Sequence, residues 1–469
     1  METQISQDKA RIEADGLGTV EVPADAYWGA STQRAKENFD ISGRTIGSFR
    51  SLIWALGAIK QAAAQANHEL QLISTDRFTC IQQAAQEVMD GLWDKHFVVD
   101  RVQGGAGTST NMNANEVVAN RATELLRVDA PDVPAINPLD EVNRGQSTND
   151  VYPTAVKLAI LKDLALLRNE YFKLAQSLRQ KAAEFATTLK VGRTQLQDAV
   201  PMTLGQEFGA FATMLFEEYE FVESVTTSLQ EINLGGTAIG TGITATKAYR
   251  HKVVAALQEI TKMDVRSAAD LIKATSDAGP FLAVSSALRR TAVKLSKICN
   301  DLRLLSSGPQ AGFGEIILPA VQPGSSIMPG KINPVIPEMV NQVAFRVIGT
   351  DTTITMAAEA GQLQLNAFEP IMTDGLLESI SWLTKACQTL RTRCVIGIEA
   401  NTELLDRQMR QSVSIVTALT PVIGYMKAAE LAQEALQDGG DILGRALNRG
   451  LVKREQAEAV LSVNALTGG

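Results

Sequence analysis

The sequence predicts a mainly all-α protein built around a bundle of long helices. Because a proline inside a helix removes a hydrogen bond and clashes with the preceding turn, long proline-free spans are candidate long helices. Between Pro153 and Pro201, apolar residues recur at steps of three and four across 160–185, and a second such pattern covers 208–219. Helices with wide apolar stripes must bury them against one another, so the middle of the chain is expected to be a bundle.

The other elements follow in chain order. An alternating pattern over residues 18–23 predicts a short strand. Periodic apolar residues predict six further helices, at 51–67, 75–93, 113–125, 285–305, 337–349 and 374–400. A glycine-rich break covers 235–242. After residue 400 the helical patterns are shorter and break at Asp438-Gly-Gly440 and Asn448-Arg-Gly450.

These shifts in pattern predict three domains. The Pro-rich segment 129–138 is the best linker candidate. We expect a mostly helical N-terminal domain over residues 1–141, a central long-helix domain over 142–397, and a small helical C-terminal domain over 398–469.

Charge and composition exclude several classes of function. Lys and Arg total 44 against 52 Asp and Glu, so the net charge of −8 has the wrong sign for a general binder of nucleic acid or anionic membranes. The N-terminal residues lack an apolar signal-type region, and the longest uncharged stretch, 411–426, is short and contains Pro421. We therefore expect a cytoplasmic protein.

Cysteine and histidine usage predicts neither disulfides nor a metal centre. Cys80, Cys299, Cys387 and Cys394 include no C-x-x-C pair, which indicates buried thiols in a reducing compartment. The three histidines, His68, His96 and His251, are far apart in sequence and form no H-E-x-x-H motif. No metal and no cofactor are expected.

Three segments combine glycine, hydroxyl side chains and carboxamides just before helical patterns. They are Gly104-Gly-Ala-Gly-Thr108-Ser-Thr-Asn111, Gly145-Gln-Ser147-Thr148-Asn149 and Gly192-Arg-Thr194-Gln195-Leu-Gln-Asp198. Taken singly, each is explained by helix capping alone. A helix N-terminus with free N–H groups and hydroxyls is also a neutral anion site, so several together could hold a dicarboxylate.

A fourth segment reads Gly324-Ser325-Ser326-Ile-Met-Pro-Gly-Lys331-Ile-Asn333-Pro334. It is not a phosphate-binding loop, because five residues separate Gly324 from Gly330 and Ile332 follows the lysine where Ser or Thr is required. No glycine run matches the dinucleotide pattern after a strand. By composition alone it could be a surface connection.

The fourth segment resembles the hallmark loop of the aspartase/fumarase superfamily, and the other three resemble that family's substrate segments in the same order. The similarity covers essentially the whole chain. It implies a small N-terminal domain, a central domain whose long helices form a twenty-helix core in a homotetramer, and active sites that draw loops from three subunits. It also implies a small-molecule substrate.

Several positions favour the aspartase branch, which expels ammonia, over the class II fumarase branch, which expels water. Segments 355–366 and 334–342 are aspartase-like, and Ala106 stands where fumarases usually have serine. Fumarases carry a histidine at the position of Gln195, while some aspartases carry glutamine. Hydroxide is a poor leaving group that benefits from an acid, whereas a protonated amine leaves as neutral ammonia. Since other aspartases keep the histidine, Gln195 argues against fumarase more than for aspartase.

The resemblance implies reversible deamination of L-aspartate to fumarate through an enediolate formed by removal of a Cβ proton. It assigns Ser325 as the base, which requires a pocket that lowers the pKa of its hydroxyl. The carboxylate next to the reacting carbon would be held by Thr108, Ser147, Thr148 and Ser326. The amino group would be held by Asn149 with Thr108 and Gln195, and the other carboxylate by Thr194, Lys331 and Asn333. Arg34 matches an aspartase arginine but is better explained as a surface arginine.

Two alternatives stay open at this point. One is a fumarate hydratase, and the other is a non-catalytic oligomeric helical scaffold. The intact Ser325, Lys331 and Asn333 argue against the scaffold.

Overall fold

The computed structural model describes residues 10–438, 440–460 and 462–467. Their contacts group into two compact units. The first unit comprises the chain up to Leu167 together with Phe221–Arg289 and Arg346–Ser381. The second comprises Arg168–Glu220, Arg290–Phe345 and the chain from Trp382 onward.

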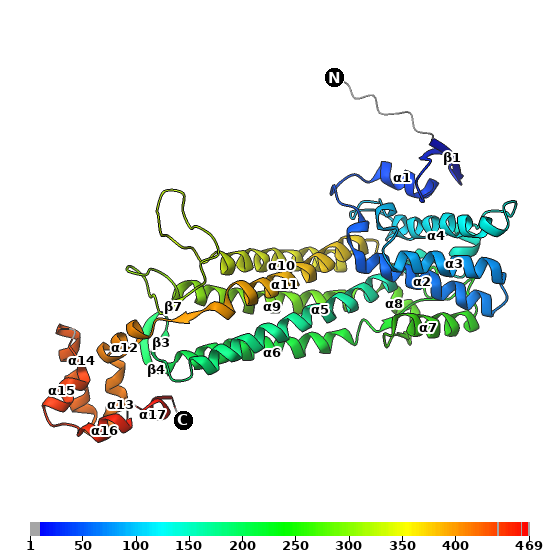
Figure 1. Cartoon of the computed structure of the whole chain (residues 1–469). Helices are drawn as coiled ribbons and strands as arrows, with labels where there is room; N and C mark the ends of the chain where they lie inside the picture. Colours follow the sequence, from blue (N-terminus) through cyan, green and yellow to red (C-terminus); the bar gives the residue numbers. More distant parts are fainter. Residues whose placement is uncertain (1–9, 439, 461, 468–469) are drawn as a thin grey trace. The chain divides into compact units, whose positions relative to one another are not determined.

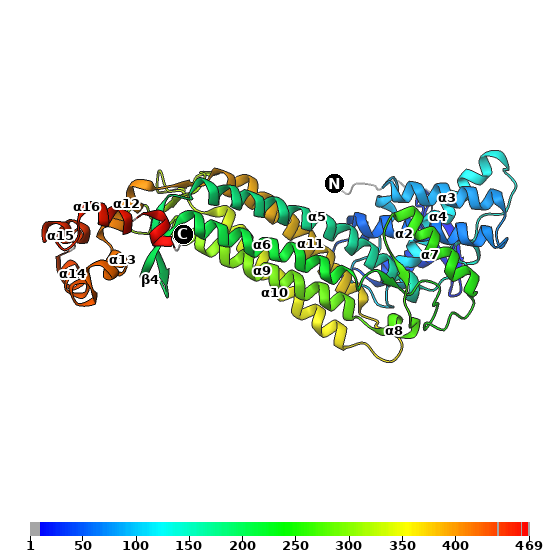
Figure 2. The same cartoon turned by 90° about the horizontal axis from the view of Figure 1, so that it is seen from below.

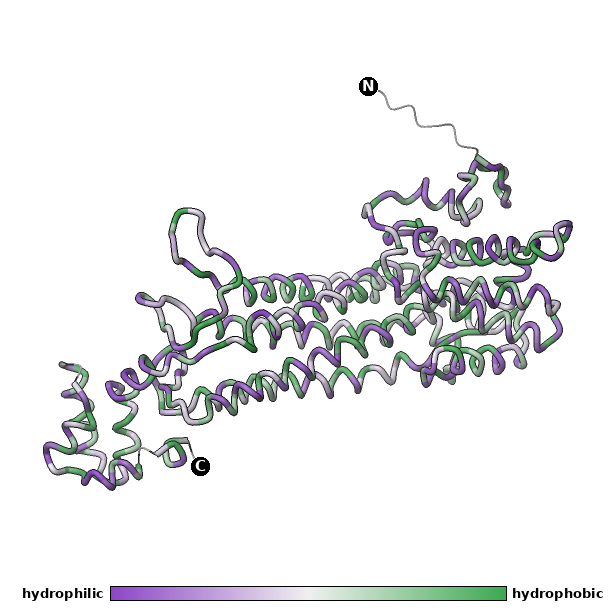
Figure 3. Tube along the Cα trace, viewed as in Figure 1, coloured by the Kyte–Doolittle hydropathy of each residue, from purple (hydrophilic) through white to green (hydrophobic). Residues whose placement is uncertain are grey.

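Five long helices contribute residues to both units. They are α5 (Thr148–Glu184), α6 (Leu204–Thr226), α9 (Gly279–Leu305), α10 (Val335–Glu359) and α11 (Glu369–Arg393). Figures 1 and 2 both show their second-unit parts running side by side, and Figure 3 shows hydrophobic and hydrophilic residues alternating along them. On α5 the predicted stripe is the buried side, since Leu167, Tyr171, Leu174 and Leu178 are fully buried. The predicted bundle of long helices is confirmed.

The first unit adds shorter helices and two small sheets. Its helices are α1 (Ala30–Asn38), α2 (Arg50–Glu69), α3 (Thr75–Met89), α4 (Thr108–Asp129), α7 (Lys247–Thr261) and α8 (Leu271–Ser276). Single turns are η1 (Ile46–Ser48), η2 (Asp94–His96) and the π-turn η3 (Pro138–Val142). Strands β1 (Ala10–Asp15) and β2 (Gly18–Pro23) pair antiparallel, and β5 (Glu231–Ile232) pairs parallel with β6 (Arg266–Ser267). The predicted strand at 18–23 is thus β2.

The second unit ends in a group of short helices. It contains the antiparallel hairpin β3 (Leu189–Thr194) and β4 (Gln197–Thr203), and β7 (Ile316–Ile317) paired with β8 (Glu399–Ala400). After the turn η4 (Val395–Gly397) come α12 (Thr402–Gln411), α13 (Ser414–Ile423), α14 (Tyr425–Asp438), α15 (Ile442–Asn448), α16 (Arg454–Val460) and α17 (Val463–Thr467). Leu419, Leu431 and Ile442 are fully buried in their shared core.

Several predicted boundaries differ from the structure. Helix α3 ends at Met89 rather than residue 93, because Gly91 takes a left-handed φ of 88°. Helix α11 ends at Arg393 rather than residue 400, because residues 399–400 pair with β7. The break at Asn448-Arg-Gly450 is confirmed, whereas the one at 438–440 includes residue 439, which lies outside the described residues. The three-domain boundaries stay a prediction.

The predicted buried thiols are confirmed for Cys299, Cys387 and Cys394, while Cys80 is only half-buried. Thr79 and Gln83, which lie near Cys80 on α3, are both exposed. Within the described part of the chain, no helix is both long enough and apolar enough to cross a membrane.

Candidate active site

The first glycine-rich segment forms the N-terminus of α4. Gly105, Ala106 and Gly107 have consecutive left-handed φ values of 86°, 53° and 88°, and Thr108 is the first helical residue. Gly107 cannot carry a side chain, because a Cβ there would lie 2.3 Å from the Tyr152 ring. Thr108 is exposed, and its hydroxyl donates to the Gly105 carbonyl at 2.8 Å. The segment therefore presents Thr108 at a helix start.

The second segment begins α5 and is held by a buried aspartate. Asp150 accepts the Ser147 N–H at 3.0 Å on one oxygen, and the N–H groups of Gly235 and Thr237 at 3.0 and 2.8 Å on the other. Burial raises the pKa of Asp150 to about 6, although these backbone donors oppose the rise. The glycine-rich break at 235–242 thus packs on the start of α5.

Pro153 leaves a carbonyl without its helical partner in this first stretch of α5. A proline has no N–H, so the Asn149 carbonyl cannot receive the usual i+4 bond. Asn233 supplies the missing donor, its side-chain amide lying 2.9 Å from that carbonyl. The Asn149 side-chain amide in turn donates to the Ala238 carbonyl at 2.8 Å. The Asn149 carbonyl is therefore bonded from outside the helix, whereas the Ser147 carbonyl receives the regular helix bond from the Val151 N–H at 3.0 Å.

A fully buried lysine joins the first two segments. The Lys60 ammonium, on α2, donates to side-chain oxygens of Asn111 at 2.8 Å, Asn143 at 3.1 Å and Gln146 at 2.8 Å. Asn111 then donates to the Thr148 hydroxyl oxygen at 3.2 Å, which leaves the Thr148 proton available to another acceptor. Burial lowers the pKa of Lys60 to about 7, and the charge of Asp150 opposes this.

Sequence reasoning missed Lys60. The sequence did contain a signal. Lys60 is the one charged residue in the otherwise uncharged run Leu52–Ala66, and a lysine inside a buried helix is expected only where polar groups pair with it.

The third segment is the tip of the β3–β4 hairpin in the second unit. Gln195 and Leu196 have φ of 55° and 62° between the paired residues Thr194 and Gln197, which is a two-residue type I′ turn. Thr194 and Gln195 are both exposed. The structure corrects the expectation of a simple loop preceding a helix.

The base of this hairpin is held by a buried carboxylate. Glu315, fully buried, lies 2.8 Å from the Lys190 ammonium and 2.5 Å from the Arg193 guanidinium. Lys190 also pairs with Glu207 at 2.6 Å. Thr194, next to Arg193, is thereby attached to a rigid base.

The fourth segment is a loop closed at its base by its own hydrogen bonds. The Gly324 N–H donates to the Lys331 carbonyl at 2.9 Å, and the Asn333 amide donates to the Gly324 carbonyl at 2.7 Å. Figure 1 shows the loop projecting beside the start of α10. A cavity of about 430 Å³ is lined by loop residues that include Ser325 and Lys331.

Ser325 is the acceptor of two backbone donors inside this loop. Its Oγ accepts the N–H of Ile327 at 3.2 Å and of Met328 at 3.1 Å. Such donors favour negative charge on the oxygen and so act in the direction of lowering the hydroxyl's pKa. Ser326 and Lys331 are exposed.

The structure therefore brings the predicted residues together in groups. Ser147, Thr148 and Asn149 adjoin the α4 turn that begins with Thr108, linked through Asn111. Ser325, Ser326, Lys331 and Asn333 share one loop. Within the described residues, no hydrogen bond joins Thr194 or Gln195 to that loop. Arg34 pairs with Asp15 at 2.8 Å, as a structural arginine would.

For residues 10–438, 440–460 and 462–467, no group of three or more His, Cys, Asp or Glu side chains is arranged to hold a metal ion.

Comparisons with known proteins agree with this architecture. The Lyase family matches residues 18–349, and the Fumarase C C-terminus family matches residues 415–468. A curated relative, the aspartate ammonia-lyase of Pseudomonas aeruginosa, is 52% identical over 435 residues, which are 92% of each chain.

Two solved structures share the fold. A fumarate lyase:delta crystallin from Brucella melitensis bound to cobalt is 50% identical with a TM-score of 0.93, and the match covers 98% of this chain and 99% of that one. A class II fumarase from Schistosoma mansoni is 34% identical with a TM-score of 0.91, over 97% of this chain and 98% of its own. The chain therefore belongs to the Lyase family of the aspartase/fumarase superfamily.

Proposed function

We propose that this protein is an aspartate ammonia-lyase, a carbon–nitrogen lyase that converts L-aspartate reversibly into fumarate and ammonia. The observation that carries the proposal is the environment of Ser325, whose Oγ accepts two backbone N–H groups in a loop that also presents Lys331 and Asn333. Relatives with this name that are about half identical over nearly the whole chain support the same activity.

The difficult step is removal of a proton from Cβ of aspartate. The electron pair left on carbon must be delocalised into the neighbouring carboxylate, which becomes a doubly charged enediolate. Ser325, deprotonated, takes the Cβ proton; the C–N bond then breaks and the protonated amine leaves as neutral ammonia. The N–H groups of Ile327 and Met328 stabilise the serine oxyanion before the transfer.

Hydroxyl donors and amides hold the carboxylate on which charge develops. Thr148 has its oxygen occupied by Asn111, and the Ser147 oxygen accepts the Asn149 N–H at 3.2 Å. Both hydroxyl protons can therefore point toward substrate, and neutral donors bind most strongly when the carboxylate gains its second charge. Thr108 and Ser326 complete this group, with Thr108 turning its proton away from Gly105.

The remaining residues bind the other end of the substrate. Lys331 supplies a fixed positive charge to the α-carboxylate, with Asn333 and Thr194 as hydrogen-bond partners. Asn149, Thr108 and Gln195 hold the amino group. Gln195, at the exposed hairpin tip, has no acidic proton to give a departing hydroxide, which favours ammonia loss over water loss.

The oligomer proposed is a homotetramer with active sites shared between subunits, in the cytoplasm. Long helices leave large apolar side chains exposed, among them Phe172 on α5, Val293 on α9, and Phe345 and Met356 on α10, the last two 62% and 67% exposed. Apolar side chains recurring along neighbouring helices favour burial against further copies of the chain.

An assay that follows fumarate by its ultraviolet absorbance, with aspartate and malate offered side by side, tests the activity. Production of fumarate from aspartate and not from malate is expected. Fumarate from malate alone would replace the proposal by fumarate hydratase, and no product from either would favour the scaffold alternative.

A further inference from the structure

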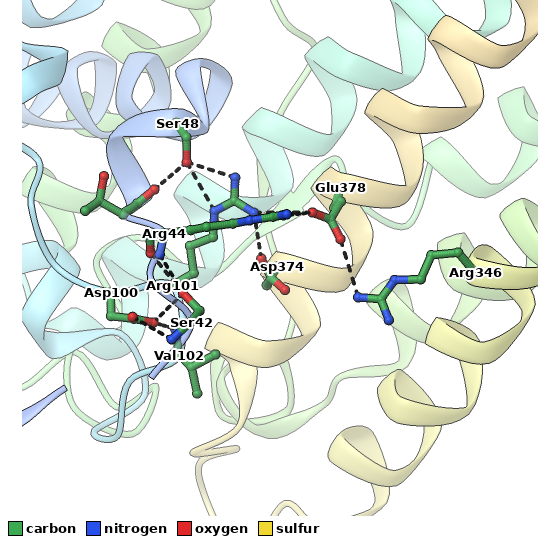
Figure 4. Close-up of polar contacts among 10 residues, drawn as sticks. Ser42, Arg44, Ser48, Asp100, Arg101, Val102, Arg346, Asp374 and Glu378 are labelled. Atoms are coloured by element: carbon green, nitrogen blue, oxygen red, sulfur yellow. Dashed lines mark hydrogen bonds and ion pairs between the residues drawn. The ribbon is translucent and has the colours of Figure 1, made fainter. Parts of the chain in front are cut away.

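A cluster of charged residues in the first unit contains a partly buried arginine that none of the proposed catalytic steps uses. Arg101, whose side chain is 9% exposed, lies 3.2 Å from Asp374 and 3.5 Å from Glu378, both on α11. Figure 4 shows its guanidinium between these acids and Ser48, with Arg44 and Arg346 also directed at Glu378. Asp374 and Glu378 are one turn apart, so their charges repel unless a cation lies between them.

Arg101 is fixed on its other sides as well. Its guanidinium donates to the Ser48 hydroxyl from Nε at 3.1 Å and from Nη2 at 2.8 Å, and it stacks 3.8 Å above the Phe49 ring. Its backbone N–H donates to the Arg44 carbonyl at 3.1 Å. The residue thus joins the segment before α2 to helix α11.

Hydrogen bonds also hold the residues on either side of Arg101, from Asp100 to Gln103, which leads into the first glycine-rich segment. Asp100, which is buried, accepts the N–H groups of Ser42 at 2.8 Å and Val102 at 2.7 Å, and these bonds hold the backbone on both sides of Arg101 (Figure 4). Gln103 donates from its side-chain amide to the Asp100 carbonyl at 2.7 Å.

Gln103 then reaches the first turn of α4. Its side-chain oxygen accepts the N–H and the hydroxyl of Thr110 at 3.1 and 3.0 Å. The residue at the N-cap of α4 is Gly107, which has no side chain to cap the helix, so Gln103 performs the capping from outside. Thr108 lies in this same turn, two residues before Thr110.

We propose that Arg101 is a positioning residue for the lyase reaction, which acts through Asp100 and Gln103 to set the place of Thr108 against the reacting carboxylate. The proposal rests on the proposed function. A displacement of about 1 Å in a group that contacts the transition state can lower a rate by about a hundredfold. Because Thr108 would bind most strongly to the enediolate, loss of Arg101 should lower kcat more than it raises KM.

A double-mutant cycle with aspartate as substrate tests the proposal in the full-length protein. Arg101→Met, which keeps an apolar stem over Phe49, should lower kcat at least about tenfold, and Thr108→Val should lower it by a similar or larger factor. In the Thr108→Val background, Arg101→Met should change kcat less than about twofold, because the residue on which it acts is already lost. The proposal would be overturned if Arg101→Met lowered kcat by the same factor in the wild-type and Thr108→Val backgrounds.

Arg346→Met is the matched control. Arg346 pairs with the same Glu378, at 3.5 Å, but it lies on α10 and its side chain is 58% exposed. In the part of the chain that the structure describes, no hydrogen bond or ion pair joins Arg346 to residues 100–103. Its kcat/KM should stay within about twofold of the wild type, and a fall equal to that of Arg101→Met would assign the effect to general charge loss.

Circular dichroism and solution mass establish whether each variant folds and assembles. If Arg101→Met does not fold, Arg101→Lys replaces it in the cycle. Lysine keeps the positive charge but lacks the planar guanidinium that bonds several partners at once. Arg101→Lys should therefore lower kcat in the wild-type background and leave kcat unchanged in the Thr108→Val background. Unchanged kcat in Arg101→Lys would overturn the proposal. Wild-type protein without aspartate turnover, or Thr108→Val with unchanged kcat, would instead overturn the proposed function or the role of Thr108.

Discussion

Ser325, the proposed base, accepts two backbone N–H groups, and its removal is the most direct test at the scale of one residue. Ser325→Ala should lower kcat for aspartate by at least about a thousandfold, because no other group is assigned to the Cβ proton. Ser325 is half-buried in a loop outside the helical core, so circular dichroism and mass should not change. Steady-state kinetics measures the effect, and a variant with most of the wild-type kcat would contradict the role.

Glu369 predicts a pH dependence of stability that is independent of catalysis. Burial raises the pKa of this carboxyl from 4.5 to about 8, opposed by the charge of Lys157, and one of its oxygens has no hydrogen-bond partner. Between these values the folded state holds a proton that the unfolded chain has released. The stability that protonated Glu369 contributes is therefore complete below pH 4.5 and is lost as the pH rises toward 8. The free energy of unfolding falls by up to about 1.4 kcal/mol per pH unit in this range.

Glu369→Gln removes that titration, so its stability relative to the wild type should improve from pH 5 to pH 8. Urea unfolding at both pH values measures this, with Glu359→Gln, an exposed carboxylate on α10, as the control that should follow the wild type. Identical pH profiles for Glu369→Gln and the wild type would contradict the shifted pKa.

At the scale of elements, the start of α4 depends on Gly107. Gly107→Ala and Gly105→Ala both force an L-residue to a φ near 87°, given the native values of 88° and 86°. Only Gly107→Ala also meets the Tyr152 ring at 2.3 Å, whereas at Gly105 the nearest atom is 3.7 Å away. Gly107→Ala should therefore be less stable than Gly105→Ala by about 2 kcal/mol. Thermal or urea unfolding of the pair measures the difference, and equal stabilities would show that the ring moves freely.

The long helices could be predicted from sequence because their apolar spacing is a local signal repeated over many turns. The β3–β4 hairpin could not, because its turn residues are Gln195 and Leu196 rather than the Asn-Gly or Asp-Gly pairs that mark a type I′ turn. The ends of α3 and α11 were missed where a single glycine or a two-residue strand pairing stopped a pattern that otherwise continued.

Some features of the candidate site could also be predicted from the sequence, whereas others could not. Thr108, Ser147, Thr148 and Ser325 are in segments whose composition and order are visible in the sequence. The contacts that hold those segments are not visible there, since Lys60 with Asn111, Asp150 with Gly235, and Asn233 with Asn149 join residues from about 50 to 85 positions apart. A local sequence pattern does not indicate which donor will meet which acceptor across such distances in the chain.

At the scale of the whole molecule, the proposed sharing of active sites between subunits predicts recovery of activity when two inactive variants are mixed. If Thr148 and Ser325 in one site come from different subunits, mixed tetramers of Thr148→Val and Ser325→Ala contain some sites with neither change. After subunit exchange at equal amounts, about a quarter of the wild-type activity should return.

The matched control mixes Ser325→Ala with Lys331→Ala. Both residues lie in one loop, so every loop in the mixture carries a change and no activity should return. Aspartate turnover before and after exchange measures both mixtures. No recovery in the first mixture, with exchange shown by mass, would mean that one subunit supplies both residues.

The loop that carries Ser325 contains its own electrostatic support. The two amide donors to Oγ come from residues two and three positions further along, and the base of the loop is tied by Gly324, Lys331 and Asn333 to one another. All these bonds join residues of the same short segment, so none of them depends on another part of the chain. For Ser325 as the proposed base, the stabilisation of the reactive oxygen is consequently encoded within one short stretch of sequence and needs no residue from elsewhere in the protein.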